Sequence, residues 1–142
     1  MKVRHNARVL LCLPFIFLVF YTEAFPEEKA PPEPDKLTLT EAFMCEDVKD
    51  QVPYNPGVVF SSAAEKVHCF STFDPVPRNT FVYHSWFFRD TLVTKIKLSV
   101  RSPRWSTYSR IQLRDSDKGP WRVEIRDRTE KLLRVLRFSV TE

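Results

Sequence analysis

The chain has 142 residues, of which 43% are hydrophobic and 13% aromatic, and its formal net charge is +4. This length and aromatic content allow one packed domain with a single core, while the presence of only two glycines excludes a glycine-rich phosphate-binding loop. The charge is unevenly divided. Residues 25–75 hold ten acids and four lysines (net −6), whereas residues 76–142 hold fifteen basic and seven acidic residues (net +8). This division predicts either an acidic face that meets a basic face within the fold, or a basic surface for anionic polymers or membrane headgroups.

The first residues have the pattern of a secretory signal peptide. A basic segment is formed by Lys2, Arg4, His5 and Arg8. An apolar run of 13 residues, 9–21, follows and contains Pro14, and small residues at Thr22 and Ala24 predict cleavage after Ala24. The run is short for a spanning helix, which favours cleavage over the alternative of a retained membrane anchor. We therefore expect a periplasmic or secreted protein that does not span the membrane after cleavage and does not meet nucleic acid.

The organisation after the cleavage site is a tether followed by a β-domain. Residues 25–36 are rich in proline and acidic groups and predict a solvated linker. Period-2 alternation then predicts strands, in chain order, within residues 37–44, 67–73, 81–88, 92–100, 105–113, 121–126 and 132–140. A loop is expected around Pro53, Pro56 and Gly57, with at most one helical turn near residues 63–66.

About seven closely spaced strands predict an all-β fold for residues 37–142, an antiparallel sandwich or a small barrel. A tryptophan on a middle strand near a cysteine-bearing strand is typical of immunoglobulin-like packing, so we expect an immunoglobulin-like β-sandwich. The order of Cys, Trp and Cys in true immunoglobulin domains is absent, so the prediction is of architecture, not of membership. The predicted core residues are Trp86, Trp121, Val123 and Phe138.

Two cysteines, Cys45 and Cys69, remain after the predicted cleavage, an even number in an oxidising compartment. They predict a disulfide that closes a loop of 25 residues (69 − 45 + 1). Two buried free thiols are the first alternative. A zinc site that also uses His68 is the second, although the disulfide would remove both thiolates.

His84 lies on the strand with the most aromatic residues. Val82, His84, Trp86 and Phe88 share one face of it, and Phe81, Tyr83, Ser85 and Phe87 share the other. His84 is either a core residue bonded to a carbonyl or hydroxyl, or the floor of a ligand site with Trp105 and Tyr108. Because both faces are apolar, we expect one to be covered by a loop or a partner. The predicted ligand or partner surface contains His84, Arg104, Trp105, Tyr108 and Arg110.

The sequence shows no spacing of catalytic or metal-binding residues. It lacks HExxH, paired CxxC and GxSxG motifs, so we expect no catalytic residue, no metal and no cofactor. One exposed tryptophan, Trp105, is a weak platform for a sugar ring. Arg122 and Arg126 flank Glu124 on the outward side of a strand, where cross-strand ion pairs are the ordinary outcome. Binding of an anionic polymer is the alternative for the basic residues.

Four ordered motifs carry a family resemblance. They are residues 84–88 (HSWFF), 104–109 (RWSTYS), 119–124 (GPWRVE) and 138–140 (FSV). Over residues 42–140 the chain resembles the bacterial domain-of-unknown-function family 2914. Ser106 stands where the family pattern has a basic residue, and the turn before Leu92 lacks the family's glycine. The resemblance implies an envelope module and no activity.

Three functions follow as hypotheses. The first is an exported, non-catalytic β-sandwich that binds an anionic envelope polymer or another envelope protein. The second is an enzyme of unfamiliar type that acts on cell-wall or lipid material. The third is a structural protein that associates through a strand edge.

Overall fold

The computed structural model describes residues 35–142, which form one compact unit. The predicted signal peptide and residues 25–34 of the predicted linker lie outside the described residues. The strands are β1 (Leu39–Lys49), β2 (Val52–Pro56), β3 (Val59–Ser61), β4 (Lys66–Phe73), β5 (Thr80–Phe88), β6 (Thr91–Val100), β7 (Trp105–Gln112), β8 (Gly119–Asp127) and β9 (Leu132–Thr141). Two single-turn 3₁₀ helices lie at Ser62–Ala64 and Asp115–Asp117.

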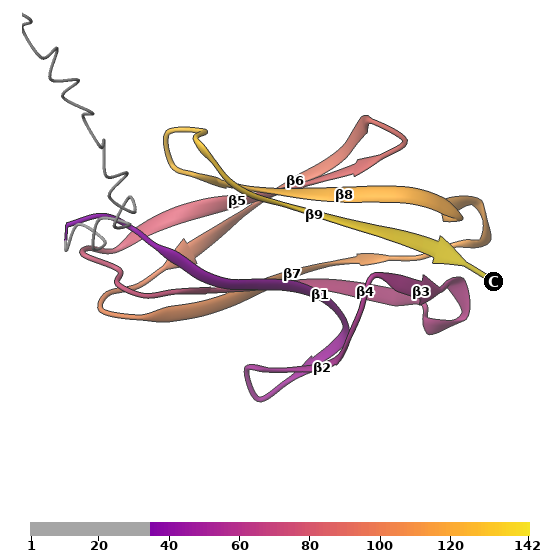
Figure 1. Cartoon of the computed structure of the whole chain (residues 1–142), viewed down its shortest axis with the longest axis horizontal. Coiled ribbons are helices and arrows are strands. Elements are labelled where there is room, and N and C mark those ends of the chain that lie inside the picture. Colours follow the sequence, from indigo (N-terminus) through magenta and orange to yellow (C-terminus); the bar gives the residue numbers. More distant parts are fainter. Residues whose placement is uncertain (1–34) are drawn as a thin grey trace, which may run out of the picture. The chain divides into compact units, whose positions relative to one another are not determined.

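The strands form two sheets packed face to face, so the predicted all-β sandwich is confirmed. One sheet has the order β2-β1-β4-β7 and the other the order β3-β9-β8-β5-β6. Figure 1 shows β1, β4 and β7 in one layer and β5, β6, β8 and β9 in the other. The short pair β3–β9 is parallel, and every other pairing in the described part of the chain is antiparallel.

The core lies between the sheets and follows the alternation in the sequence. On β5 and β8, every second side chain points inward, because successive residues of a strand face opposite sides of its sheet. All four predicted core residues are buried: Trp86 and Val123 at 0% exposure, Phe138 at 4% and Trp121 at 5%. The rings of Trp86 and Trp121 both pack against Phe138, with centroids 6.1 and 6.0 Å away. The core prediction is therefore confirmed.

All seven predicted strands are present, and the structure adds two. β2 and β3 lie in the segment predicted as a loop, where Pro53, Pro56 and Gly57 interrupt any alternation. Both are edge strands, the position in which proline is tolerated because one side of the backbone needs no partner. The predicted helical turn is the 3₁₀ turn Ser62–Ala64.

The predicted disulfide does not form, since Cys45 and Cys69 are both free, buried thiols. The register of β1 and β4 explains this. Cys45 lies opposite His68, and Cys69 lies opposite Met44. Directly opposed residues share a face, so the two cysteines lie on opposite faces of the sheet and their Cβ atoms point apart. Such a pair cannot be bridged without moving the backbone.

Among residues 35–142 there is no helix of the length and hydropathy needed to cross a membrane.

Candidate functional site

A hydrogen-bonded cluster crosses the core and joins the two sheets. We call Ser71, His84, Trp86 and Ser109 the inter-sheet cluster. Ser71 and Ser109 come from β4 and β7 in one sheet, and His84 and Trp86 come from β5 in the other. The Nδ1 atom of His84 lies 2.8 Å from Ser109 Oγ, and its Nε2 atom lies 3.1 Å from Ser71 Oγ. The indole N–H of Trp86 donates to Ser109 Oγ at 3.0 Å.

Counting donors and acceptors fixes the tautomer of the histidine. Ser109 Oγ accepts from Trp86, so its own proton has an acceptor only if His84 Nδ1 is unprotonated. His84 then carries its proton on Nε2 and donates a hydrogen bond to Ser71 Oγ. The Ser71 hydroxyl in turn donates a long hydrogen bond, of 3.5 Å, to the Thr107 carbonyl oxygen. In this arrangement every polar side-chain atom of the cluster has a partner.

The cluster has no access to a substrate. His84 and Ser71 are fully buried, and Ser109 is 5% exposed. Burial lowers the pKa of His84 from its ordinary value to about 3, because the imidazolium would lose its hydration. The prediction of His84 on a ligand surface is therefore wrong, and its interpretation as a core residue bonded to a hydroxyl is correct.

The other residues of the predicted ligand surface are divided among three places. Trp105 is half-buried, packs against the core and lies beneath the guanidinium of Arg101, with the ring centroid 5.5 Å from Cζ. Tyr108 and Arg110 lie on the outer face of β7, opposite Phe70 and His68 of β4. Arg104, in the β6–β7 loop, forms a 3.9 Å ion pair with Asp74 in the β4–β5 loop. These residues do not converge on one site with His84.

On the outer face of the five-stranded sheet, cationic side chains lie over aromatic rings. Lys97 Nζ lies 3.9 Å from the centroid of Phe81, Lys95 Nζ lies 4.1 Å from that of Tyr83, and Arg122 Cζ lies 4.0 Å from that of Phe87. We call this surface the cationic face. It comprises Phe81, Tyr83, Phe87, Lys95, Lys97, Arg122 and Arg126. The second apolar face of β5 was expected to be covered by a loop or a partner. In the structure, charged side chains of β6 and β8 lie over its rings instead.

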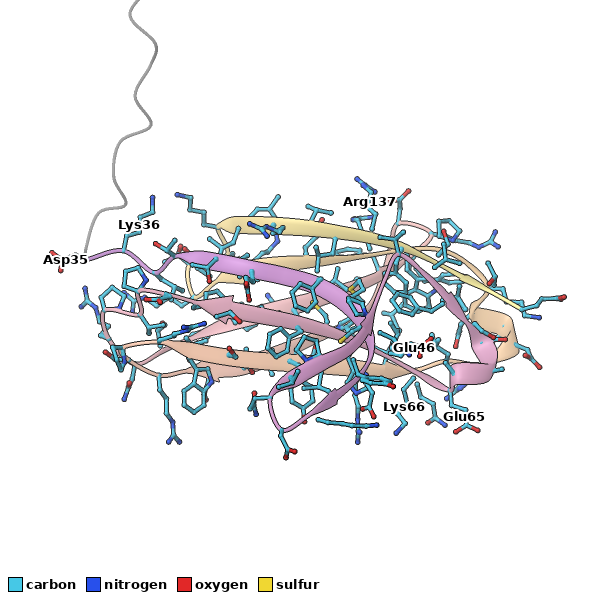
Figure 2. All side chains as sticks on the ribbon, turned by 60° about the horizontal axis from the view of Figure 1, so that its bottom comes forward. Asp35, Lys36, Glu46, Glu65, Lys66 and Arg137 are labelled. Atoms are coloured by element: carbon cyan, nitrogen blue, oxygen red, sulfur yellow. The ribbon has the colours of Figure 1, made fainter. Side chains whose placement is uncertain are left out.

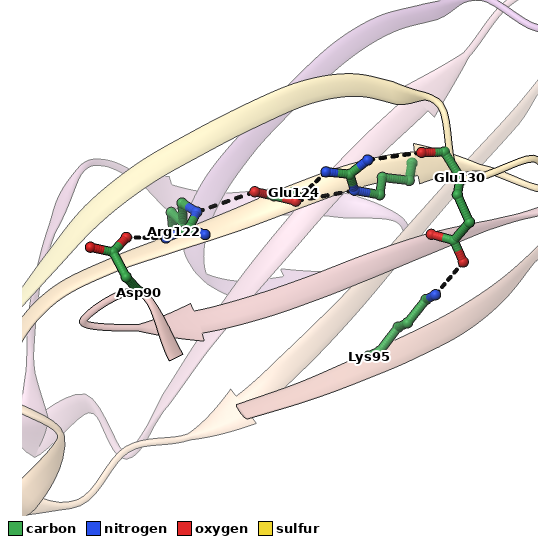
Figure 3. A network of polar contacts seen from close by, with 6 residues as sticks. Asp90, Lys95, Arg122, Glu124 and Glu130 are labelled. Atoms are coloured by element: carbon green, nitrogen blue, oxygen red, sulfur yellow. Dashed lines mark hydrogen bonds and ion pairs between the residues drawn. The ribbon is translucent and has the colours of Figure 1, made fainter. Parts of the chain in front are cut away.

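A chain of ion pairs runs along this face (Figure 3). Glu124 accepts from Arg122 at 3.3 Å and from Arg126 at 2.7 Å, Arg122 also pairs with Asp90, and Lys95 pairs with Glu130. Burial would raise the pKa of Glu124, but hydrogen bonds from Arg126 and Arg122 outweigh it and hold that pKa below its ordinary value. The predicted pairing is confirmed, although Arg122 and Arg126 pair along β8 and not across strands.

In the described part of the chain, no group of three or more His, Cys, Asp or Glu side chains is arranged to hold a metal ion. The sequence interpretation also missed several charged residues that gather at one end of the cationic face, namely Arg89, Asp90 and Arg137. The alternation places Arg137 outward, but the convergence with Arg89 depends on the pairing of β9, β8 and β5, which no local pattern encodes.

The two-sheet architecture and the inter-sheet cluster define a β-sandwich domain. Residues 79–140 match the model of the family described as "Protein of unknown function (DUF2914)". The match covers β5–β9 and therefore includes His84, Trp86 and Ser109 of the inter-sheet cluster. The search of curated proteins found no match.

Proposed function

We propose that the chain is an exported, non-catalytic β-sandwich module that binds an anionic envelope component through the cationic face. The observation that carries the proposal is the set of three cation–aromatic pairs on the outer face of the five-stranded sheet. A cation held on a ring loses less side-chain freedom when it binds an anion, so the face is preorganised.

Two observations support a role in binding over a role in catalysis. The Ser–His–Ser arrangement, the one that most resembles a nucleophile and its base, is sealed in the core. A general base must reach the proton that it abstracts, and a histidine with a pKa of about 3 is a poor base near neutral pH. The two lysines of the cationic face, in contrast, are exposed, and its two arginines are partly exposed. The export part of the proposal rests on the signal-peptide pattern of residues 1–24.

The experiment is co-sedimentation of the chain without residues 1–24 with peptidoglycan sacculi and with anionic lipid vesicles. We expect pelleting at low salt that is lost at high salt, because exposed charges are screened within about 10 Å at 0.1 M salt. The double variant Lys95→Gln/Lys97→Gln should weaken binding by about 2 kcal/mol, at about 1 kcal/mol for each lysine near an anionic surface.

The matched control is Lys66→Gln/Arg110→Gln, which removes the same charge from β4 and β7 of the other sheet. The control should pellet as the unmodified protein does. Equal losses for the two double variants would mean that net charge acts without a defined face. Absence of pelleting with both sacculi and vesicles would contradict the proposal and direct attention to a protein partner.

A second candidate function is association through a strand edge. The edge strands are β2 and β7 in one sheet and β3 and β6 in the other. Among residues 35–142, six of the eight exposed large apolar side chains lie on these four strands, namely Val52, Tyr54, Val59, Leu92, Val93 and Tyr108. Exposed apolar edges are templates for pairing with another chain.

A further inference from the structure

A small pocket lies at one end of the cationic face, beside the turn that joins β5 to β6. Its volume is about 120 Å³, and four of its lining residues carry charge: Arg89, Asp90, Arg122 and Arg137. Phe87, Pro120 and Trp121 supply apolar walls. Three cations and one anion give the lining a net charge of +2.

Two of the guanidinium groups come from facing positions on neighbouring strands. Arg122 of β8 lies directly opposite Arg137 of β9, and like charges in such positions repel. Arg122 is fixed by Phe87 beneath it and by Asp90 and Glu124 beside it, and its side chain is only 18% exposed. Arg137 has no ion-pair partner in residues 35–142, and its side chain points away from the sheets (Figure 2).

The third guanidinium group is held in place by the backbone. Arg89 and Asp90 are the two central residues of the β5–β6 turn, with φ of 45° and 65°. Gly119 (φ +132°) lies beside Arg89, and a Cβ atom at this glycine would be 3.1 Å from Arg89 Nη2. Glycine at this position therefore leaves room for the guanidinium, which also donates to the Lys118 carbonyl at 3.4 Å.

The turn holds two non-glycine residues in the left-handed region, where each is strained, and both of them line the pocket. Asp90 is the counter-charge that the fold itself supplies. Its carboxylate pairs with Arg122 although its side chain is 90% exposed. A carboxylate that is itself this exposed is held weakly by its partner, so an incoming anion can replace it.

We propose that this pocket binds a phosphoryl group, and that the ligand displaces the Asp90 carboxylate from Arg122. A carboxylate presents two oxygens in one plane and a single negative charge, which one guanidinium group can match in a bidentate pair. The three guanidinium groups that line this one pocket suit an anion with three or more oxygens and more than one negative charge. The inference rests on the proposed anion-binding function and deepens it, since it names the group that the cationic face recognises.

The test is a titration of the chain without residues 1–24 with inorganic phosphate at constant ionic strength. All buried core residues lie between Met44 and Val140, so this form retains the whole core. The readout is the indole N–H resonance of Trp121, a pocket residue whose N–H donates to the Asp117 carbonyl at 2.7 Å. We expect saturable binding. Arg137→Gln should weaken it about tenfold or more, the value of one charge-assisted hydrogen bond.

A second variant, at Asp90, tests whether the ligand displaces the carboxylate, because only displacement predicts tighter phosphate binding. Asp90→Asn removes the competing carboxylate and should tighten phosphate binding by up to about fivefold. Arg134→Gln, a loss of the same charge from β9 at a residue outside the pocket, should leave phosphate binding unchanged. Far-UV circular dichroism confirms that each variant is folded.

Further arms of the same titration separate the sources of the phosphoryl group. Glycerol phosphate tests a soluble ester, and vesicles of phosphatidylglycerol compared with phosphatidylcholine test a lipid headgroup. The inference is overturned if phosphate acts no better than chloride, if Arg137→Gln and Arg134→Gln behave alike, or if Asp90→Asn weakens binding. Any of these results together with salt-sensitive pelleting on sacculi would leave the proposed function standing without the pocket.

Discussion

At the scale of single residues, the inter-sheet cluster shows how a polar group can be placed in a core of large apolar side chains. Unpaired polar groups are costly when they are buried, and paired ones fix a unique arrangement. Ser71, His84 and Ser109 satisfy one another across the gap between the sheets, and no buried polar side-chain atom in residues 35–142 lacks a partner. The cluster thus specifies how the sheets align.

The buried histidine makes stability depend on pH. In the unfolded chain His84 takes up a proton near its ordinary pKa of about 6.5, whereas in the folded protein it does so only near pH 3. Between these values the unfolded state holds the extra proton, so its contribution to stability is full above pH 6.5 and is lost as the pH falls. We expect His84 to lower the free energy of unfolding by about 2 kcal/mol between pH 7 and pH 5.

Urea unfolding of the unmodified protein and of His84→Gln at both pH values measures this contribution. The variant is less stable at pH 7 because it disturbs the cluster, but its loss between pH 7 and pH 5 should be smaller by the stated amount. His68→Gln is the companion variant, since burial also lowers the pKa of that histidine. An identical pH dependence for His84→Gln and the unmodified protein would contradict the account.

The sequence predicted part of this site. Alternation placed His84 on the same face of its strand as Val82 and Trp86, which is correct. It could not supply the partners, because Ser71 and Ser109 lie 13 and 25 residues away in the other sheet. The sequence also indicated that Arg122 and Arg126 point outward. It could not show that they form the cationic face with residues of β5 and β6, because that grouping depends on the strand order.

At the scale of elements, the register of β1 and β4 decides the state of the cysteines. A shift of one residue in the pairing register would move every side chain of a strand to the other face of its sheet. Counting cysteines in the sequence suggested a bridge, and the register places the two side chains on opposite faces. Each thiol is buried separately, and burial raises the pKa of Cys45 to about 11.

A thiol assay checks this arrangement in the chain without residues 1–24. We expect two reactive thiols per chain in denaturant and almost none in the native protein, because only an accessible thiolate reacts quickly. The melting temperature should be the same with and without reductant. A count of no thiols in denaturant would show that a disulfide forms in spite of the register.

The strands also show which elements local sequence alternation can predict and which it cannot. Six of the seven long strands were predicted within two residues of their observed bounds, whereas the first was predicted to end at residue 44 and continues to Lys49. β2 and β3 have five and three residues, and β3 finds its parallel partner in β9, about eighty positions later in the chain. Such a pairing is a property of the assembled sheet, and no local alternation encodes it.

At the scale of the whole molecule, the uneven charge of the two halves of the sequence is not neutralised internally. Within residues 35–142, Arg104–Asp74 is the one ion pair that joins residues 76–142 to the acidic preceding segment, and it is long and exposed. The other lysine and arginine pairs lie wholly inside residues 76–142. The expectation of an acidic face meeting a basic face is therefore wrong for the described domain, and a net positive charge remains available to a ligand.

The edge strands give a prediction about assembly. If the edge of β6 pairs with a second copy, the sedimentation coefficient should rise with protein concentration. Val93→Lys, which places a charge on that exposed edge, should abolish the rise, since edge lysines block strand addition. Val58→Lys alters an equally exposed valine outside the strands and should leave the rise intact. A concentration-independent coefficient for the unmodified protein would remove edge pairing as a function.

The domain has distinct ends. Asp35, Lys36 and Thr80 lie together around a hollow at one end, while Arg89, Asp90 and Trp121 lie at the other, beside the far end of β5. The nine residues of β5 separate the two by roughly 26 Å. If the segment before Asp35 were fastened to a support, the domain would stand as a rigid spacer with the arginine pocket at its tip. The length of β5 would then set the distance between that support and the anions that the pocket can reach.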